Sequence, residues 1–237
     1  MLGIIGGMGP GASALFYDMI RSKTDAGCDQ ENLDLILLSH ASMPDRTEAI
    51  LSKDESRIRA LRDKLLADAI FLQNAGCTAI AVTCNTAHCF VNMIEHEVEI
   101  PFIHMIRETA EAMASEFSGK RVAILATDGT IETKLYQDEL SKQGVIAIIP
   151  SQEIQTLIMS EIYGYIKSGK PADEKTWMKI DEYIKAQGCE AAVLACTELS
   201  VVRRELSLGR FYFDPMEIMA ERCLDFYEKR GEVKKRG

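Results

Sequence analysis

The sequence predicts an α/β protein made of two similar α/β domains with mainly parallel sheets, related by pseudo-two-fold symmetry. Two observations support this fold class. Short apolar segments alternate with longer helical patterns along the 237 residues, which is typical of βα units around a parallel sheet. In addition, residues 74–86 resemble residues 186–198, which indicates an internal duplication. A chain of this length can form two domains of about 100 residues each.

The repeat centres on two apolar segments, each preceded by a glycine and ended by a cysteine. Residues 76–84 and 188–196 carry glycine, cysteine, alanine and cysteine at the same four positions. Both segments lack polar alternation, so each is expected to be a strand covered on both faces. A duplicated half that brings its own cysteine to the same corner of the fold predicts two facing thiols, those of Cys84 and Cys196.

The elements follow from the alternation of apolar runs and helical patterns. The expected strands are residues 2–6, 33–38, 78–83, 101–103, 121–125, 145–149, 190–195 and 210–213. The expected helices are residues 11–23, 55–75, 86–97, 105–117, 130–143, 152–168, 173–187 and 215–230. We expect the chain to cross over near residue 104 and its last helix to return. The first domain would then comprise residues 1–103 and 210–237, and the second residues 104–209.

Composition excludes several classes of function. The net charge of −9, from 27 basic and 36 acidic residues, argues against a nucleic-acid partner, which would require a basic face. Apolar runs fall short of the roughly 18 residues that span a bilayer, and the first residues lack the basic region of a signal peptide. The seven cysteines suggest no disulfide framework. We therefore expect a cytoplasmic protein with reduced thiols and no membrane partner.

Cys84 and Cys196 follow their strands directly, at the edge where open α/β sheets bind ligands. A helix is expected after each cysteine, and a helix N-terminus stabilises a thiolate or a bound carboxylate. Asn85, Thr86 and Thr197 would supply further donors there. The other five cysteines are interpreted as structural.

Metal binding is the main alternative for this corner, because Cys84, His88 and Cys89 are close in sequence. The second half offers only Cys196, without a nearby histidine, whereas zinc sites usually show paired ligands. We therefore expect no metal.

The glycine loop at residues 6–11 could instead bind a dinucleotide. It matches the fingerprint only loosely, because Pro10 interrupts the turn. The second strand also ends in Ser39-His40 where an NAD site requires an acid. A tight turn, or close approach of the backbone to a small anion, explains the glycines better.

Two basic residues could hold an acidic ligand beside the thiols. Arg46 lies in an ordered-looking loop after the second strand, and Lys167 lies near the end of a helix in the other half. Considered alone, Arg46 and Lys167 are each interpreted as a charged residue at the surface. Beside the thiol pair, one cation from each half could bind the two carboxylates of an acidic amino acid.

With these residues in place, the chain resembles the aspartate/glutamate racemase family, specifically its cofactor-independent aspartate racemase branch. The matching stretches run in order along the chain: GGMGP (6–10), PDRT (44–47), CNTAH (84–88), LATDGTI (125–131), IYGYIK (162–167), CTE (196–198) and DPM (214–216). The resemblance implies a homodimer that inverts aspartate without pyridoxal phosphate or metal. It assigns acid and base roles to Cys84 and Cys196, and carboxylate binding to Arg46 and Lys167. It also implies that further residues line the site, namely Met8, Asn85, Thr86, Thr127 and Thr197.

The glutamate racemase branch resembles this chain less. That branch typically has an acid and a serine in the first glycine loop and a histidine after the second cysteine, where this chain has Met8, Gly9, Thr197 and Glu198. Glutamate or broad acidic specificity stays open, because one methylene depends on pocket depth. A two-lobed amino-acid-binding protein without activity is a further alternative, although binding alone needs no matched thiols.

Overall fold

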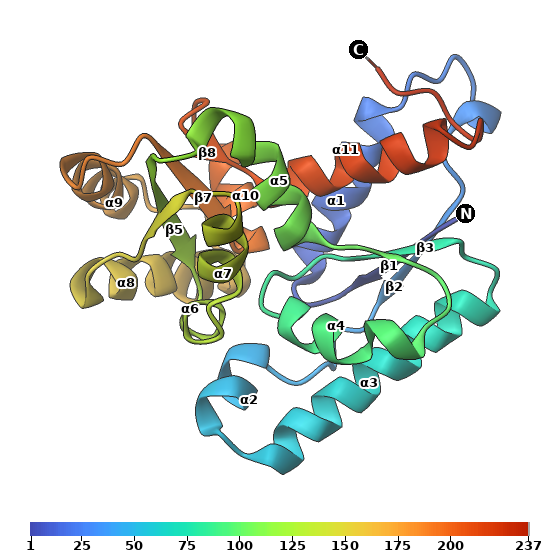
Figure 1. The fold of residues 1–237 in the computed structure, drawn as a ribbon, viewed down its shortest axis with the longest axis horizontal. Helices are drawn as coiled ribbons and strands as arrows, with labels where there is room; N and C mark the ends of the chain where they lie inside the picture. Colours follow the sequence, from blue (N-terminus) through green and yellow to red (C-terminus); the bar gives the residue numbers. More distant parts are fainter. Residues whose placement is uncertain (237) are drawn as a thin grey trace.

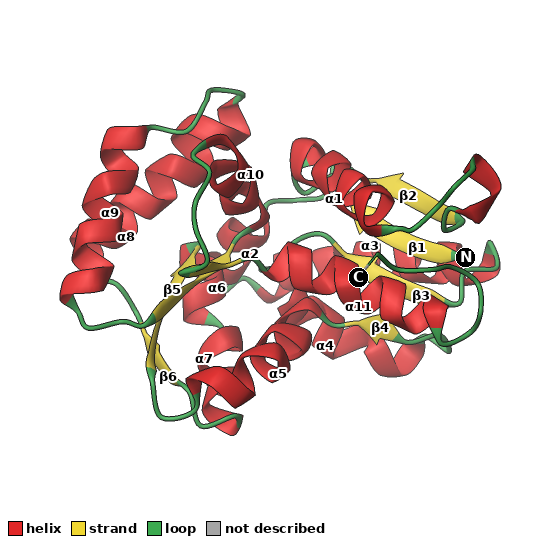
Figure 2. Cartoon of the chain, turned by 90° about the horizontal axis from the view of Figure 1, so that it is seen from above, coloured by secondary structure: helices red, strands yellow, loops and turns green. Residues whose placement is uncertain are grey.

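The computed structural model describes residues 1–236 and divides them between two sheets that form separate lobes (Figures 1 and 2). Each sheet of this described part has four strands, and every pairing is parallel. The strand orders are β2-β1-β3-β4 and β6-β5-β7-β8, so the two halves repeat the same topology. This arrangement confirms the predicted fold class.

The strands and helices lie close to the expected ranges. The strands are β1 Leu2–Gly6, β2 Leu35–Ser39, β3 Ala79–Val82, β4 Phe102–Ile103, β5 Arg121–Ala126, β6 Ile146–Ile148, β7 Ala191–Ala195 and β8 Tyr212–Phe213. The helices are α1 Pro10–Lys23, α2 Arg46–Ser52, α3 Glu55–Asn74, α4 His88–Ile94, α5 Met105–Phe117, α6 Asp128–Glu132, α7 Leu135–Lys142, α8 Gln152–Met159, α9 Glu174–Ala186, α10 Thr197–Glu205 and α11 Pro215–Glu228.

Helices cover both faces of each sheet, as predicted from the strands in which polar and apolar residues do not alternate. In the first sheet, α1 and α11 pack on one face and α3 and α4 on the other. In the second sheet, α5 and α7 cover one face, whereas α8, α9 and α10 cover the other. The central strands β3 and β7 are buried along their whole length. Each therefore ends at a fixed, shielded position. Cys196 follows β7 directly, and Cys84 follows β3 after Thr83.

The glycine loop after β1 is a tight turn. Gly7 has a left-handed φ of 86°, and a Cβ there would lie 2.5 Å from the backbone nitrogen of His40. The backbone N–H of Gly7 donates to the Ser13 hydroxyl at 3.0 Å. The turn therefore requires glycine for packing, and it carries Met8 toward the second lobe.

The C-terminal boundary of the second domain differs from the prediction. β8 pairs with β7 in the second sheet, although the division at residue 210 assigned residues 210–213 to the first domain. The aromatic strand belongs with β7 because Tyr212 packs into the core of the second lobe. The last helix, α11, does return to the first core, where Met216 and Met219 contact the cluster around β1.

Three helical segments also differ from the expectation. The loop predicted around Arg46 is helix α2, which Asp45 caps by accepting the backbone N–H of Glu48 at 2.8 Å. The helix expected over residues 130–143 is two helices, because Lys134 takes a left-handed φ of 54° between α6 and α7. The helix expected over residues 152–168 changes to a π-helical turn at Ser160–Tyr165 and a 3₁₀ turn at Ile166–Ser168.

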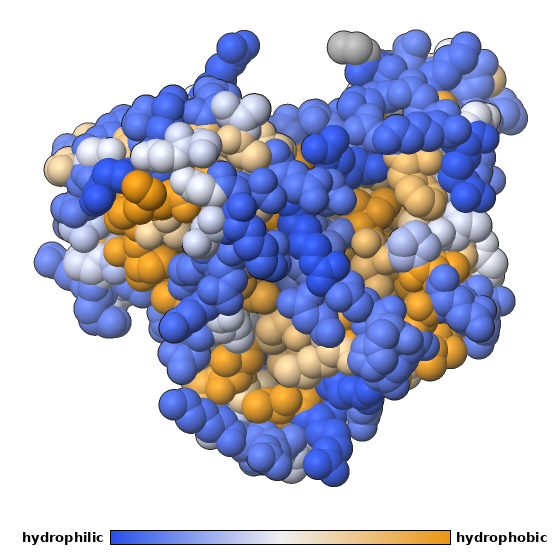
Figure 3. All heavy atoms as spheres, in the orientation of Figure 1, coloured by the Kyte–Doolittle hydropathy of each residue, from blue (hydrophilic) through white to orange (hydrophobic). Residues whose placement is uncertain are grey.

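The molecular surface is mainly hydrophilic on the face shown in Figure 3, with apolar residues in separate patches. The large exposed hydrophobic side chains include Phe71 and Met178, which lie on α3 and α9 in different lobes. Within residues 1–236, every helix is too short or too polar to cross a bilayer.

Candidate active site

A cavity of about 10 Å³ lies where the segments after β3 and β7 meet. Cys84 comes to it from the first sheet and Cys196 from the second, and each cysteine is only 6% exposed. All of the predicted site residues line this cavity: Met8, Arg46, Cys84, Asn85, Thr86, Thr127, Lys167, Cys196 and Thr197. The fold therefore brings residues from both halves of the chain to one enclosed point.

The Cys84 segment is held by His88, at the start of α4. The Nδ1 of His88 bonds to the carbonyl oxygen of Cys84 at 2.9 Å, and its Nε2 accepts the backbone N–H of Met105 at 3.2 Å. Burial lowers the pKa of His88 to about 4, so the ring is neutral. Both ring nitrogens are engaged by backbone groups. The ring therefore positions the cysteine instead of presenting a nitrogen to a metal ion.

Arg46 lies beside Cys84 as the first residue of α2. Burial opposes its charge, but the interaction with Cys84 raises the pKa of the guanidinium. Its terminal nitrogens donate to the carbonyl oxygens of Pro44 at 2.9 Å and Met8 at 3.0 Å. The Nε is buried without a partner among the described residues. Arg46 thus keeps one unused donor in the wall of the cavity.

Asn85 offers a second unused donor. Its Oδ1 accepts the hydroxyl of Tyr136 at 2.5 Å, whereas its Nδ2 is buried with no hydrogen-bond partner in the described chain. Leaving a buried donor unpaired costs about 1–3 kcal/mol. Two such donors on residues that line one cavity could be satisfied by an acceptor, such as a carboxylate, once the cavity opens.

Three threonine hydroxyls join the two halves beside the cavity. Thr86 lies 2.9 Å from Thr127 and 2.8 Å from Thr130, and the latter two are 3.1 Å apart. Thr127 also caps α6 through the backbone N–H of Thr130. These contacts fix the position of the Cys84 segment relative to the second lobe.

Cys196 is the N-cap residue of α10, and its surroundings differ from those of Cys84. Its thiol donates to Oε2 of Glu198 at 3.0 Å. Burial raises the pKa of this thiol well above its usual range, and the neighbouring carboxylate raises it further. The two cysteines thus follow corresponding strands, but only Cys196 caps a helix directly, since α4 begins at His88, and the charges beside them are opposite.

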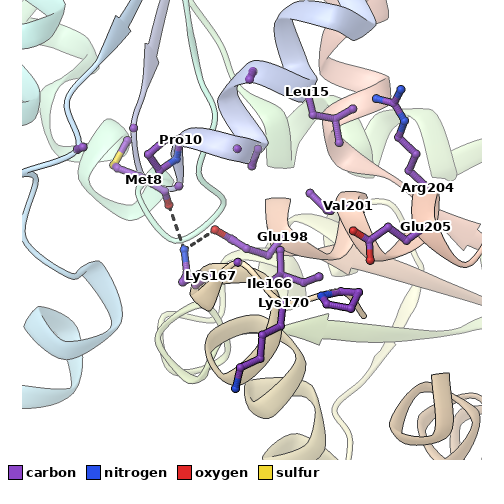
Figure 4. Close-up of a pocket in the computed structure, with 18 of the residues that line it drawn as sticks. Met8, Pro10, Leu15, Ile166, Lys167, Lys170, Glu198, Val201, Arg204 and Glu205 are labelled. Carbon is purple, nitrogen blue, oxygen red and sulfur yellow. Dashed lines mark hydrogen bonds and ion pairs between the residues drawn. The ribbon is translucent and has the colours of Figure 1, made fainter. Parts of the chain in front are cut away.

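Lys167 stands at the mouth of the cavity. Its ammonium group donates to the Met8 carbonyl oxygen at 3.3 Å and forms an ion pair with Oε1 of Glu198, as Figure 4 shows. Burial opposes the charge, but Glu198 and Cys196 raise the pKa of Lys167. A second cavity of about 830 Å³ lies on the outer side of this ion pair. Both cavities share Met8, Arg46, Lys167 and Glu198, so this group separates them.

Sequence reasoning missed three lining residues: Thr47, Tyr163 and Glu198. Glu198 had a detectable signal, because it lies two residues after Cys196 at the start of a helix. Thr47 also had one, since the Asp45 and Glu48 spacing is typical of a helix cap that would have ordered this segment. Tyr163 had none. Its hydroxyl donates to Asp45 at 3.0 Å across the lobes, a contact that only the tertiary structure creates.

Comparison with known proteins gives matches that include all of the residues lining the cavity. The family model described as Asp/Glu/Hydantoin racemase matches residues 5–223. The chain belongs to this family. An aspartate racemase from Picrophilus torridus has a similar structure, with 29% identity and a TM-score of 0.77 over 99% of this chain and 95% of its own.

Two further proteins that the chain resembles share less of its sequence. The broad-specificity amino-acid racemase RacX of Bacillus subtilis is 24% identical over 85% of this chain and 87% of its own length. A glutamate racemase from Francisella tularensis, solved with D-glutamate, shares the fold with 16% identity and a TM-score of 0.70 over 99% of this chain and 83% of its own. The racemase family is thus established.

Proposed function

We propose that this protein interconverts L- and D-aspartate without a cofactor, by a two-base mechanism that uses Cys84 and Cys196. One observation carries the proposal: two buried thiols, supplied by matching strands of different sheets, line a single cavity. Inversion at an amino-acid Cα requires a base on one side and an acid on the other. The similarity to an aspartate racemase along nearly the whole chain supports aspartate as the substrate.

In this mechanism one cysteine, as thiolate, removes the α-proton while the other, as thiol, delivers a proton from the opposite side. The cysteines exchange these roles for the other enantiomer. The α-proton is weakly acidic, so fixed donors must stabilise the negative charge that develops on the substrate. Asn85 and Thr86 beside one thiol, and Thr197 at the N-terminus of α10 beside the other, supply such donors.

Arg46 and Lys167 bind the substrate's two carboxylates in this proposal. Lys167 already pairs with Glu198, so the substrate must replace that carboxylate. The inner cavity also holds no more than about one water molecule. Substrate entry therefore requires Lys167 and Glu198 to separate and the inner and outer cavities to join.

Isotope incorporation tests the proposal. The protein is incubated with L-aspartate in D₂O, without pyridoxal phosphate, and the enantiomers are separated early in the reaction. We expect deuterium at Cα of the D-aspartate product and little in the recovered L-aspartate, because different sulfurs remove and supply the proton. Bound aspartate without exchange or inversion would instead identify an amino-acid-binding protein.

A broad-specificity amino-acid racemase is the second candidate, because RacX aligns with most of this chain. The outer cavity of about 830 Å³ also has room for longer side chains. A chiral assay across the common L-amino acids distinguishes the candidates. Preference for aspartate supports the first, and comparable rates for glutamate or neutral amino acids support the second. Assembly as a homodimer is likewise proposed, and light scattering during gel filtration measures it.

A further inference from the structure

We propose that Glu198 is a positioning residue that keeps Cys196 in its protonated form until substrate binds. The acid role this gives Cys196 rests on the proposed function, whereas the protonation state of Cys196 does not. The observation behind it is direct: the buried thiol donates to a carboxylate oxygen of Glu198, in the first turn of the helix that Cys196 caps.

Glu198 is fixed tightly enough to act in this way. The residue is 3% exposed, and both of its oxygens are engaged. Oε2 accepts the Cys196 thiol at 3.0 Å and the Thr197 hydroxyl at 3.4 Å, and Oε1 pairs with Lys167. A Cβ at Gly9 would lie 2.8 Å from Oε1, so the glycine loop also confines this carboxylate.

The other groups that face Cys196 do not reverse this effect. Lys167 favours the thiolate, but its charge is balanced by its ion pair with Glu198. Tyr136 of α7 and Tyr163 of the π-helical turn are phenols, and burial raises the pKa of both. From the other lobe come Cys84 and Arg46, which interact with each other.

The two thiols therefore differ in the charge of the group beside them. Cys84 faces a guanidinium, whereas Cys196 faces a carboxylate. A negative charge on Cys196 would lie 3.0 Å from the charge of Glu198, which strongly disfavours it. Before substrate arrives, Cys196 is thus the proton donor of the pair. It becomes the base only after Glu198 moves away, and substrate binding at Lys167 would cause that movement.

The titration of Cys196 tests this inference without any turnover. The ultraviolet absorbance of the thiolate is followed against pH, as the difference between each protein and its Cys196→Ala counterpart. Iodoacetamide labelling with peptide mapping gives the rates at Cys84 and Cys196 separately. Glu198→Gln should lower the Cys196 midpoint by about one pH unit or more, because it removes the charge and adds an N–H donor. The Cys84 midpoint should move much less.

Two further variants complete the experiment. Lys167→Gln should move the Cys196 midpoint upward, in the opposite direction to Glu198→Gln, and this arm applies even if Glu198→Gln does not fold. Asp18→Asn removes a carboxylate that borders the outer cavity and pairs with Arg21, and it should leave the midpoint unchanged.

An unchanged Cys196 midpoint in Glu198→Gln, or equal shifts at both cysteines, would overturn the inference. The result is independent of the proposed function. A shifted midpoint in a protein that does not racemise aspartate would retain the role of Glu198 and reject the reaction. Racemisation of aspartate with an unshifted Cys196 midpoint would support the reaction and reject the role of Glu198.

Discussion

The hydroxyls of Thr86 and Thr127 lie 2.9 Å apart, and this hydrogen bond joins the segment after β3 to the segment after β5. Thr130 completes the contact from α6. Because Thr86 is two residues from Cys84, the bond holds the first thiol in place relative to the second lobe.

Thr86→Val keeps the shape of the side chain but removes the hydroxyl shared by Thr127 and Thr130. We expect the free energy of unfolding to fall by about 1–3 kcal/mol, because buried hydroxyls lose a partner. Urea denaturation measures the change. Thr156→Val on the exposed face of α8 is the matched control, and its effect should stay within about 0.5 kcal/mol. Equal losses in both variants would contradict a special role for Thr86.

Cys84→Ala and Cys196→Ala should each reduce aspartate racemisation by about 10²–10⁴-fold or more, because each removes a group that transfers a proton. Calorimetry should show that aspartate still binds. Cys28→Ala is the control, since this thiol is exposed and does not line the cavity. Near-normal racemisation by either site variant would exclude the two-thiol mechanism.

Arg46→Ala and Lys167→Ala should impair substrate binding more than folding. Each removes a charged donor worth about 1.5–3 kcal/mol to a carboxylate, which corresponds to a rise in KM of about tenfold to a hundredfold. Steady-state kinetics and thermal denaturation separate the two effects. Unchanged KM in both proteins would show that the carboxylates bind elsewhere.

Gly129→Ala tests the contact between α2 and α6. A Cβ at this position would lie 2.8 Å from Cα of Thr47, a backbone atom that lines the opposite side of the contact. Such overpacking costs about 1–3 kcal/mol in the free energy of unfolding. Gly11→Ala in α1 meets no atom within 4 Å and should stabilise the protein by about 0.4–1 kcal/mol. Chemical denaturation compares the pair, and a stable Gly129→Ala variant would mean that α2 shifts readily.

Stability should fall as the pH drops from about 6.5 toward 4. Burial lowers the pKa of His88 from 6.5 to about 4 and also lowers that of His104, which the neighbouring His88 lowers further. The unfolded chain therefore binds protons in this range that the folded chain does not, and His88 alone accounts for up to about 3 kcal/mol. Urea denaturation across the range measures the slope. His104→Gln should flatten it, whereas His96→Gln at the surface should not.

The sheets were predictable because their signals are local, and the meeting of the two cysteines was predictable because the chain repeats itself. Apolar segments ended by a cysteine occur twice, and each parallel sheet places such an end at its own ligand-binding edge. Arg46 and Lys167 stood out as basic residues, and the resemblance assigned them carboxylate binding before their positions were known.

The remaining features depend on tertiary contact. Lys134 splits a helical pattern because its backbone turns left-handed, and nothing in the side chain requires that turn. The π-helical turn that precedes Lys167 likewise has no recognisable signal in the sequence. The sequence places Glu198 near the start of the helix expected after Cys196, but it does not show which group the carboxylate faces. Its contact with the Cys196 thiol follows from burial, which forces the two groups to satisfy each other.

Cys84 and Cys196 have unlike neighbours, a guanidinium and a carboxylate, and for a racemase this asymmetry has a limited consequence. Mirror-image amino acids have the same free energy in an achiral solvent, so the reaction ends at equal amounts of both. The forward and reverse directions can differ in kcat and in KM. The value of kcat/KM must nevertheless be the same for L-to-D and D-to-L conversion. Both directions start from equally stable free species and pass through one transition state.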